Sequence, residues 1–318
     1  GGEIGSKSEP FSFYELEKEG KLKYYAYSGS LLNDNTDTPE ADMDAVAAEA
    51  EAHNSKHYQL IGAKVFCDGV VEAHTAWLLD DYADKPGYRG VSRFDDHKKM
   101  VRLIKAAEKH NMNVHVHSIG DASTKAWIDA FAEAEEATGN FDMRNALAHL
   151  HIVREKDLKR IADYNIMAVA GMMWVGKEPN IFEQEVAYVG REKAEHGYPI
   201  KSIVDYGGVL ASHSDFPVSQ VVSVPWTVCL GVTGYLPSYG KDMIRHPDQC
   251  LSRLDTLKAL TINVAYMWHE EDRMSSLETG KLANITVFDR DFMRDDFKDI
   301  ENAKCLATFV DGELVYKA

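Results

Sequence analysis

The sequence predicts an α/β protein in which parallel strands alternate with helices, arranged either as an open sheet or as a closed barrel. Short apolar runs recur along the chain, and helical stretches separate them. Polar side chains stand where several of these runs end, which is where parallel α/β folds place their chemistry. The length of 318 residues suits one large α/β domain with a small appendage.

Residues 114–121 show this pattern most clearly. An apolar strand ends on His117 and turns directly into a helix expected at 122–137. Because side chains alternate along a strand, His115 and His117 lie on one side of it, and Val114 and Val116 lie on the other. Taken alone, the stretch is equally compatible with a strand that carries two structural histidines.

The alternation of strand and helix continues along the chain. We expect strands at residues 21–28, 61–69, 114–117, 144–150, 166–172 and 208–215. We expect helices at residues 42–55, 94–110, 122–137, 155–163, 201–206 and 254–268. The run at 166–172 is almost entirely apolar, as in parallel strands that are buried on both faces. Six strand–helix units are therefore predicted between Lys21 and Trp268.

The C-terminal part follows a different pattern. Strands are expected at residues 283–288 and 305–316 with no helix between them, and Asp311-Gly312 is a typical hairpin turn. We therefore predict three regions: an uncertain N-terminal segment at 1–20, the main α/β domain at 21–270, and C-terminal strands of a small β domain at 271–318.

Composition excludes several classes of partner. The formal net charge of −16 argues against nucleic acid and against anionic membrane surfaces. The longest apolar run, Val221–Val232, contains Ser223 and Pro225 and is too short to span a membrane. The four cysteines show no CxxC spacing, which predicts a reducing compartment and a cytoplasmic protein.

Four polar side chains stand at the ends of predicted strands. They are Lys64, His117, His149 and Asp215. The two histidines lie about one strand–helix unit apart, and Asp215 follows about two units later, so the carboxyl ends of their strands are expected to converge. Two imidazoles and a carboxylate are suitable zinc ligands. Each residue alone has a structural explanation, such as a paired lysine or a core histidine, but their order predicts a shared site.

Two further residues are candidates for substrate contact. His74 follows the strand that carries Lys64, although it is also placed to stabilise its own loop. Trp174 belongs to an apolar loop after the strand at 166–172, where it either lines a pocket or packs in the core. His151 and His213 each lie two residues from a proposed ligand, and we interpret both as supporting or structural residues.

Several motifs resemble the metal-dependent amidohydrolase superfamily. The matching stretches, in order, are residues 63–69, 117–121, 214–218, 257–265 and 272–284. The branch they resemble is amidohydrolase family 3, which includes N-substituted formamide deformylases. The resemblance extends from about Tyr24 to the C-terminus.

This resemblance implies a TIM-type (β/α)8 barrel with a small β-sandwich, and one or two divalent metals, usually zinc. It implies that Lys64 carries a carbamate derived from carbon dioxide and bridges the metals, and that His117 and His149 bind the second metal. Asp215 would bind the first metal and act as general acid and base. The implied reaction is hydrolysis of a non-peptide carbon–nitrogen bond in a small amide-type substrate by a metal-activated water.

The sequence also departs from the family pattern. No strand-ending His-X-His pair precedes Lys64, and six strand–helix units are visible instead of eight. We hypothesise that a stretch is missing between about Ser6 and Pro10, as well as at the N-terminus. An incomplete barrel has an open edge, for which we expect a homo-oligomer. The pattern predicts at most one tightly bound metal, and the alternative function is an impaired relative with a binding or regulatory role.

Overall fold

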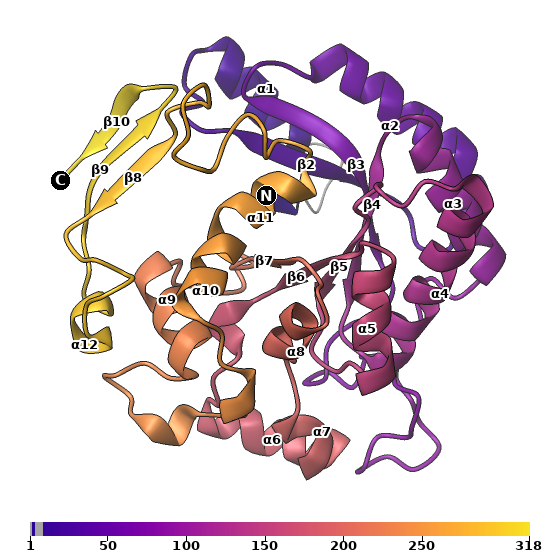
Figure 1. The fold of residues 1–318 in the computed structure, drawn as a ribbon. Helices are drawn as coiled ribbons and strands as arrows, with labels where there is room; N and C mark the ends of the chain where they lie inside the picture. Colours follow the sequence, from indigo (N-terminus) through magenta and orange to yellow (C-terminus); the bar gives the residue numbers. More distant parts are fainter. Residues whose placement is uncertain (1, 4–8) are drawn as a thin grey trace.

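Parallel strands, taken in the order of the chain, form the main sheet. The computed structural model describes residues 2–3 and 9–318. The strands are β1 (Gly2–Glu3), β2 (Ala26–Leu31), β3 (Tyr58–Phe66), β4 (Asn113–Ser118), β5 (Ala146–His149), β6 (Met167–Ala170) and β7 (Leu210–Ser212). Each pairs with the next in parallel, and the sheet curves with helices on its outer face (Figure 1). The predicted parallel α/β class is confirmed.

Helices connect the strands and cover the sheet. They are α1 (Glu9–Lys18), α2 (Pro39–His53), α3 (His97–Lys109), α4 (Asp121–Thr138), α5 (Glu155–Asp163), α6 (Pro179–Val189), α7 (Arg191–Glu195), α8 (Ile200–Asp205), α9 (Val224–Thr233), α10 (Arg253–Leu260), α11 (Ile262–Met267) and α12 (Phe297–Ile300). The helix predicted at 254–268 is two helices, because the backbone of Thr261 leaves the helical region. Within the described residues, none of these helices combines the length and the hydrophobicity needed to cross a membrane.

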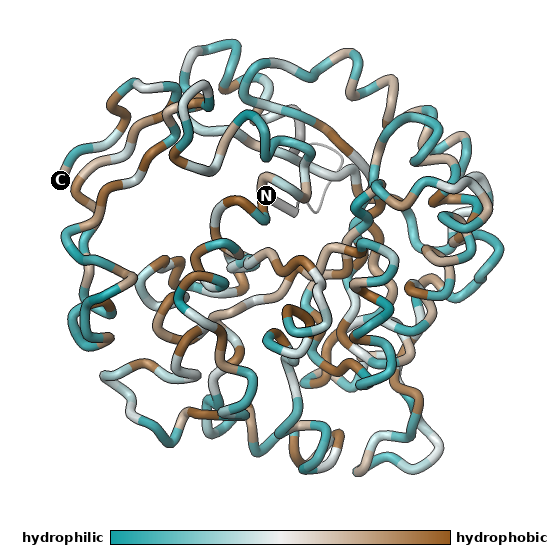
Figure 2. Tube along the Cα trace, viewed as in Figure 1, coloured by the Kyte–Doolittle hydropathy of each residue, from teal (hydrophilic) through white to brown (hydrophobic). Residues whose placement is uncertain are grey.

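The core lies between the sheet and the helices. The alternation predicted for β4 is confirmed: Val114 and Val116 are fully buried in the main apolar cluster with Trp127 and Phe131 of α4, whereas His115 lines a cavity on the other side. Burial of each such apolar side chain is worth about 1.5–3 kcal/mol. Figure 2 shows hydrophobic residues along the strands and mainly hydrophilic residues on the outer turns of the helices.

The main sheet has two edge strands. In the described part of the chain, β1 pairs only with β2 and β7 only with β6, so the sheet does not close. Near these edges Trp268, the residue after α11, stacks on Tyr27 of β2 with ring centroids 6.1 Å apart, and Asn263 donates a hydrogen bond to the carbonyl of Leu210 at 2.8 Å. The homo-oligomer that we expect at an open edge stays a prediction, and the predicted gap at residues 6–10 falls mostly outside the described residues.

The C-terminal strands form a separate antiparallel sheet, as predicted. Its strands are β8 (Ile285–Phe288), β9 (Cys305–Val310) and β10 (Glu313–Lys317), in the order β10-β9-β8. The hairpin turn carries Asp311, whose carboxylate accepts hydrogen bonds from Tyr25 at 2.7 Å and His57 at 3.0 Å and pairs with Lys56 at 2.5 Å. Burial raises the pKa of Asp311, but these partners outweigh it and lower the pKa to about 2. One carboxylate thus ties the small sheet to the residues just before β2 and β3.

Helix α4 buries a carboxyl group in the protein interior. Glu135 is 2% exposed. The amide of Asn145 lies 3.5 Å from its Oε1, and Oε2 has no hydrogen-bond partner among the described residues. Burial raises the pKa of Glu135 to about 8, so this side chain is neutral at pH 7.

We predict that Glu135 makes the protein less stable as the pH rises. The folded chain keeps the proton up to about pH 8, whereas the unfolded chain releases it near its ordinary value of 4.5. The free energy of unfolding therefore falls between these pH values, by about 5 kcal/mol in all. Glu135→Gln removes this dependence, so urea unfolding should show a variant close to wild type at pH 5 and more stable at pH 9.

The matched control is Glu51→Gln, which changes an exposed glutamate on α2. It should leave the difference in stability between pH 5 and pH 9 as in the wild type. Equal pH dependence in Glu135→Gln and wild type would contradict the neutral state of this carboxyl group.

Candidate active site

The predicted residues lie at the carboxyl ends of four strands. Lys64 is near the end of β3 and is 2% exposed, His117 is the penultimate residue of β4, and His149 ends β5. Asp215 follows β7 by three residues. Because these strands run parallel in one sheet, all four side chains belong to the same edge of the sheet.

Three imidazoles and one indole meet above β4 to β7. The ring centroids of His117 and His149 are 4.5 Å apart, and those of His149 and His213 are 4.9 Å apart. Trp174, in the turn after β6, stacks on His149 at 5.7 Å and lies edge-on to His213 at 5.1 Å. The predicted pair of histidines is therefore adjacent, and Trp174 contacts it directly.

A cavity of about 630 Å³ lies inside the curve of the sheet. Its polar lining includes Lys64, His115, His213 and Asp215, together with apolar side chains from β6, β7 and α11. His213 contacts both the cavity and the histidine cluster, so it joins the two parts of the site. From the sequence we interpreted His213 only as a supporting or structural residue. Its place in the site depends on where β7 ends, which is at Ser212, directly before it.

The backbone is strained at two of the predicted residues. His149 and the following Leu150 have φ values of 76° and 52°, and Asp215 has a φ of 52°. These left-handed conformations cost a non-glycine residue roughly 1 kcal/mol or more and concentrate at functional sites. The turn after β5 is held by a hydrogen bond from the Leu150 amide to the carbonyl of Ser118 at 3.0 Å.

His74 and Trp174 occupy different environments. Nε2 of His74 lies 2.8 Å from Oδ2 of Asp84, and its ring packs 3.8 Å from that of Tyr188, so it stabilises its own loop. Its contact with substrate stays a prediction. Nε1 of Trp174 donates a hydrogen bond to Ser219 at 2.9 Å, which fixes the indole beside His149.

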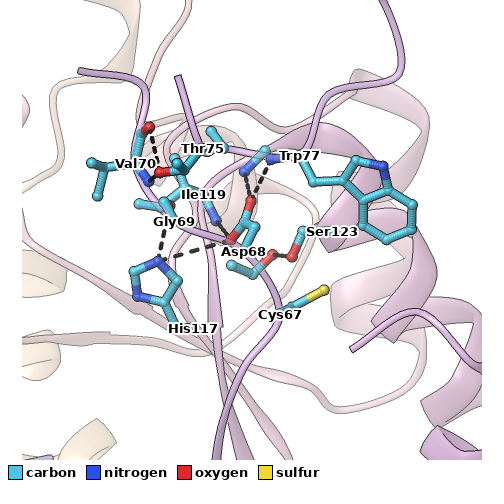
Figure 3. Close-up of polar contacts among 12 residues, drawn as sticks. Cys67, Asp68, Gly69, Val70, Thr75, Trp77, His117, Ile119 and Ser123 are labelled. Carbon is cyan, nitrogen blue, oxygen red and sulfur yellow. Dashed lines mark hydrogen bonds and ion pairs between the residues drawn. The ribbon is translucent and has the colours of Figure 1, made fainter. Parts of the chain in front are cut away.

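A buried carboxylate that we did not select from the sequence joins two loops of the site. Asp68 is fully buried, two residues past the end of β3 (Figure 3). Its oxygens accept hydrogen bonds from the backbone N–H groups of Ile119 (3.0 Å), Gly120 (2.8 Å) and Trp77 (2.9 Å). Burial outweighs these donors and raises the pKa of Asp68 to about 7. The available signal in the sequence was an Asp-Gly pair directly after a buried strand.

A second buried ionic cluster supports the other side of the site. Glu185 of α6 forms a two-pronged pair with Arg245 and lies 3.6 Å from Nε2 of His151. Burial raises the pKa of Glu185, but these two partners dominate and lower it to about 2. The ring of His151 stacks on Tyr198 at 4.3 Å. This cluster anchors the chain just after His149, consistent with the structural role expected for His151.

Two of the predicted metal ligands, His117 and His149, lie side by side. Nε2 of His117 lies 3.0 Å from the carbonyl oxygen of Gly69, so this nitrogen carries the proton, and in the neutral ring Nδ1 holds the lone pair that a metal needs. His149 supplies a second imidazole beside it. Searched across residues 2–3 and 9–318, no group of three or more His, Cys, Asp or Glu side chains is arranged to hold a metal. Two imidazoles are fewer donors than a zinc site needs, and a carbamate on Lys64 as the third ligand stays a prediction.

The fold and site define a class: a parallel α/β protein whose lysine, histidine and aspartate side chains gather at the carboxyl ends of its strands. The model of the Amidohydrolase family matches residues 1–316, and the chain belongs to this family. The match confirms the family resemblance of the sequence motifs.

Relatives of this chain are identical to it at about a quarter of the aligned residues. The chain is 26% identical to the Protein LONG AFTER FAR-RED 3 of Arabidopsis thaliana, over 82% of this chain and 44% of that protein. It is 26% identical to an N-substituted formamide deformylase of Arthrobacter pascens, over 80% of this chain and 45% of that protein. A crystal structure of an uncharacterized metal-dependent hydrolase from Pyrococcus furiosus matches with a TM-score of 0.69 and 25% identity. The match covers 89% of this chain and 54% of that protein. The chain thus spans about half the length of these relatives.

We predict that zinc binding depends on His117 and His149 and not on His115. Removal of either adjacent imidazole leaves too few donors, whereas His115 lies two residues nearer the start of β4. Zinc content of the purified chain, measured by mass spectrometry, should be at most one per wild-type chain and close to zero in His117→Ala and His149→Ala.

His115→Ala is the matched control, because it removes an imidazole on the same side of the same strand. It should retain zinc as the wild type does. Equal loss of zinc from all three variants would show that the wrong histidine of β4 has been assigned.

Proposed function

We propose that this chain belongs to a metal-dependent hydrolase that cleaves a non-peptide carbon–nitrogen bond in a small amide-type molecule. The observation that carries the proposal is the adjacency of His117 and His149 at the ends of neighbouring strands, with Lys64 and Asp215 on the wall of the cavity beside them. The formamide deformylase among the relatives supports the choice of bond.

The site residues divide the work between metal binding and proton transfer. His117 and His149 would hold a divalent metal, which we propose to be zinc, and a carbamate on Lys64 would add oxygen ligands that an ammonium group lacks. When bound, the metal would polarise the carbonyl group of the substrate and lower the pKa of a water molecule. Asp215 accepts the proton of the attacking water at its carboxylate and delivers it to the departing nitrogen.

The cavity suits a substrate of small-molecule size. About 630 Å³ is within the range of pockets that bind such ligands. Its wall includes Met267 and Trp268 as apolar contacts, and Phe216 lies on the loop after Asp215. We infer that the polar end of the substrate lies toward Lys64 and Asp215, and the apolar part toward these side chains.

The cysteines support a reducing compartment, which we propose to be the cytoplasm. All four are thiols, and Cys67 and Cys229 are buried. Burial raises the pKa of each of these two thiols to about 12, so neither forms the reactive thiolate at pH 7.

Formate release from an N-substituted formamide tests the proposal. The zinc-loaded chain, supplied with bicarbonate, should release formate, and Asp215→Asn should lower kcat by about 10²–10⁴-fold because the proton acceptor is lost. Zinc content should be measured in parallel, so that loss of the metal is distinguished from loss of proton transfer.

Asp205→Asn is the control, since Asp205 is an exposed residue of α8 that pairs with Lys201. It should leave kcat unchanged. Wild-type rates in Asp215→Asn would contradict the role of Asp215. A zinc-loaded chain that hydrolyses dipeptides but no formamide would contradict the proposed bond, and one that binds the amide without turnover would favour the binding alternative.

A further inference from the structure

Asp68 connects the strand of Lys64 to the strand of His117. It follows β3, and its carboxylate lies against the turn between β4 and α4. Oδ1 accepts from the amide of Ile119, and Oδ2 accepts from the amides of Gly120 and Trp77. One side chain therefore satisfies three backbone donors from two different loops, in a place that water does not reach.

The two loops lie in close contact, and the loop after β3 is itself tightly folded. A Cβ atom added to Gly120 would lie 1.9 Å from the carbonyl oxygen of Trp77, and one added to Gly69 would lie 2.1 Å from Oγ1 of Thr75. Thr75 closes the loop after β3, because its Oγ1 accepts a hydrogen bond from the amide of Val70 at 2.9 Å. The position of Gly69 is consequently determined from both sides.

The carbonyl of Gly69 is the acceptor for the ring of His117. Nε2 of His117 lies 3.0 Å from this oxygen and 3.8 Å from Oδ1 of Asp68 (Figure 3). Both oxygens favour a proton on Nε2, and the shorter contact sets the direction of the ring. The carboxyl group of Asp68 thus helps to determine where the Gly69 carbonyl stands and itself lies beside the same imidazole nitrogen.

The contacts of Asp68 extend to the strand of His149. The amide of Leu150 donates to Ser118 at 3.0 Å, and the amide of Ile152 donates to Ile119 at 2.9 Å. Since Ile119 is itself held by Asp68, the loop after β5 rests on the loop that this carboxylate fixes.

An amide cannot replace this carboxylate without loss. Asparagine has the same shape, but one of its two acceptor oxygens becomes an NH₂ group, which is a donor. In Asp68→Asn, at least one of the three backbone donors faces another donor. A buried unsatisfied N–H group costs about 1–3 kcal/mol, so the loops should shift to relieve it.

We propose that Asp68 is a positioning residue, which holds the Gly69 carbonyl against Nε2 of His117 and so keeps that imidazole in the tautomer and orientation of a metal ligand. The inference rests on the proposed function, which supplies the metal. The tautomer of His117, however, can be measured in the chain without metal. Groups behind a ligand histidine typically change metal affinity by about 10–100-fold.

Nitrogen NMR of the full chain labelled with ¹⁵N-histidine tests the proposal without metal. Two-bond proton–nitrogen correlations report which ring nitrogen carries the proton, and the His117 signals are identified by their loss in His117→Gln. Wild type should show the Nε2–H tautomer at neutral pH. Asp68→Asn should show a mixture of tautomers, and titration with zinc alone should give an affinity about 10–100-fold lower.

Thr75→Val gives a second, milder test, because it removes the two hydrogen bonds between Oγ1 of Thr75 and the backbone of Val70 without changing a charge. It should shift the His117 signals in the same direction by a smaller amount. Asp96→Asn is the control: Asp96 also accepts two backbone hydrogen bonds, but at the start of α3. It should change neither the tautomer nor the zinc affinity.

A folded Asp68→Asn chain with the wild-type tautomer and zinc affinity would overturn the proposal. If circular dichroism shows that this variant does not fold, Thr75→Val decides, and unchanged His117 signals in it would overturn the proposal. If wild type binds no zinc but the tautomer still changes in Asp68→Asn, the positioning role stands and the proposed hydrolase function fails.

Discussion

The parallel register of β3, β4 and β5 is the constraint on which the site depends. It pairs Lys64 with His115, Phe66 with His117, and Ser118 with His149. Side chains alternate between the two faces of a strand, so a slip of one residue in β4 would exchange its histidines for its valines. The valines are fully buried against α3 and α4, and that burial makes the slip costly. The apolar core thus sets the orientation of the polar site.

Buried polar groups then fix the loops that follow these strands. Asp68 satisfies three backbone donors on one side of the site, and Glu185 pairs with Arg245 on the other. Loss of one partner from a buried pair typically costs about 3–5 kcal/mol, since the other charge stays buried without compensation. Such groups bring little net stability compared with apolar packing. Their effect is to select one arrangement of the loops, which a site with strained residues such as His149 requires.

The two edges of the sheet shape the cavity. Since β7 and β1 do not pair in the described chain, the space inside the sheet is bounded by α11 and by the loop after β7 as well as by strands. Trp268 stacks on Tyr27 across this region. Side chains from connecting segments therefore form part of the wall, and such segments vary between relatives more readily than the strands do. Specificity for a substrate is expected to reside there, while the strand ends carry the chemistry.

The sequence by itself determined the parallel α/β class, the positions of the main strands along the chain and the polar residues at their ends. Apolar runs, helical periodicity and polar strand ends are local signals, so Lys64, His117, His149 and Asp215 could be selected without a structure. Only the tertiary structure decided the roles of Asp68 and His213, because their partners are distant in sequence: Gly120 for Asp68, and His149 for His213. The break at Thr261 was missed for a different reason: the residues around it keep a helical pattern of apolar side chains, and only the backbone conformation of Thr261 shows that the helix ends there. Local patterns specify elements, whereas contacts between distant segments place the side chains that a site requires.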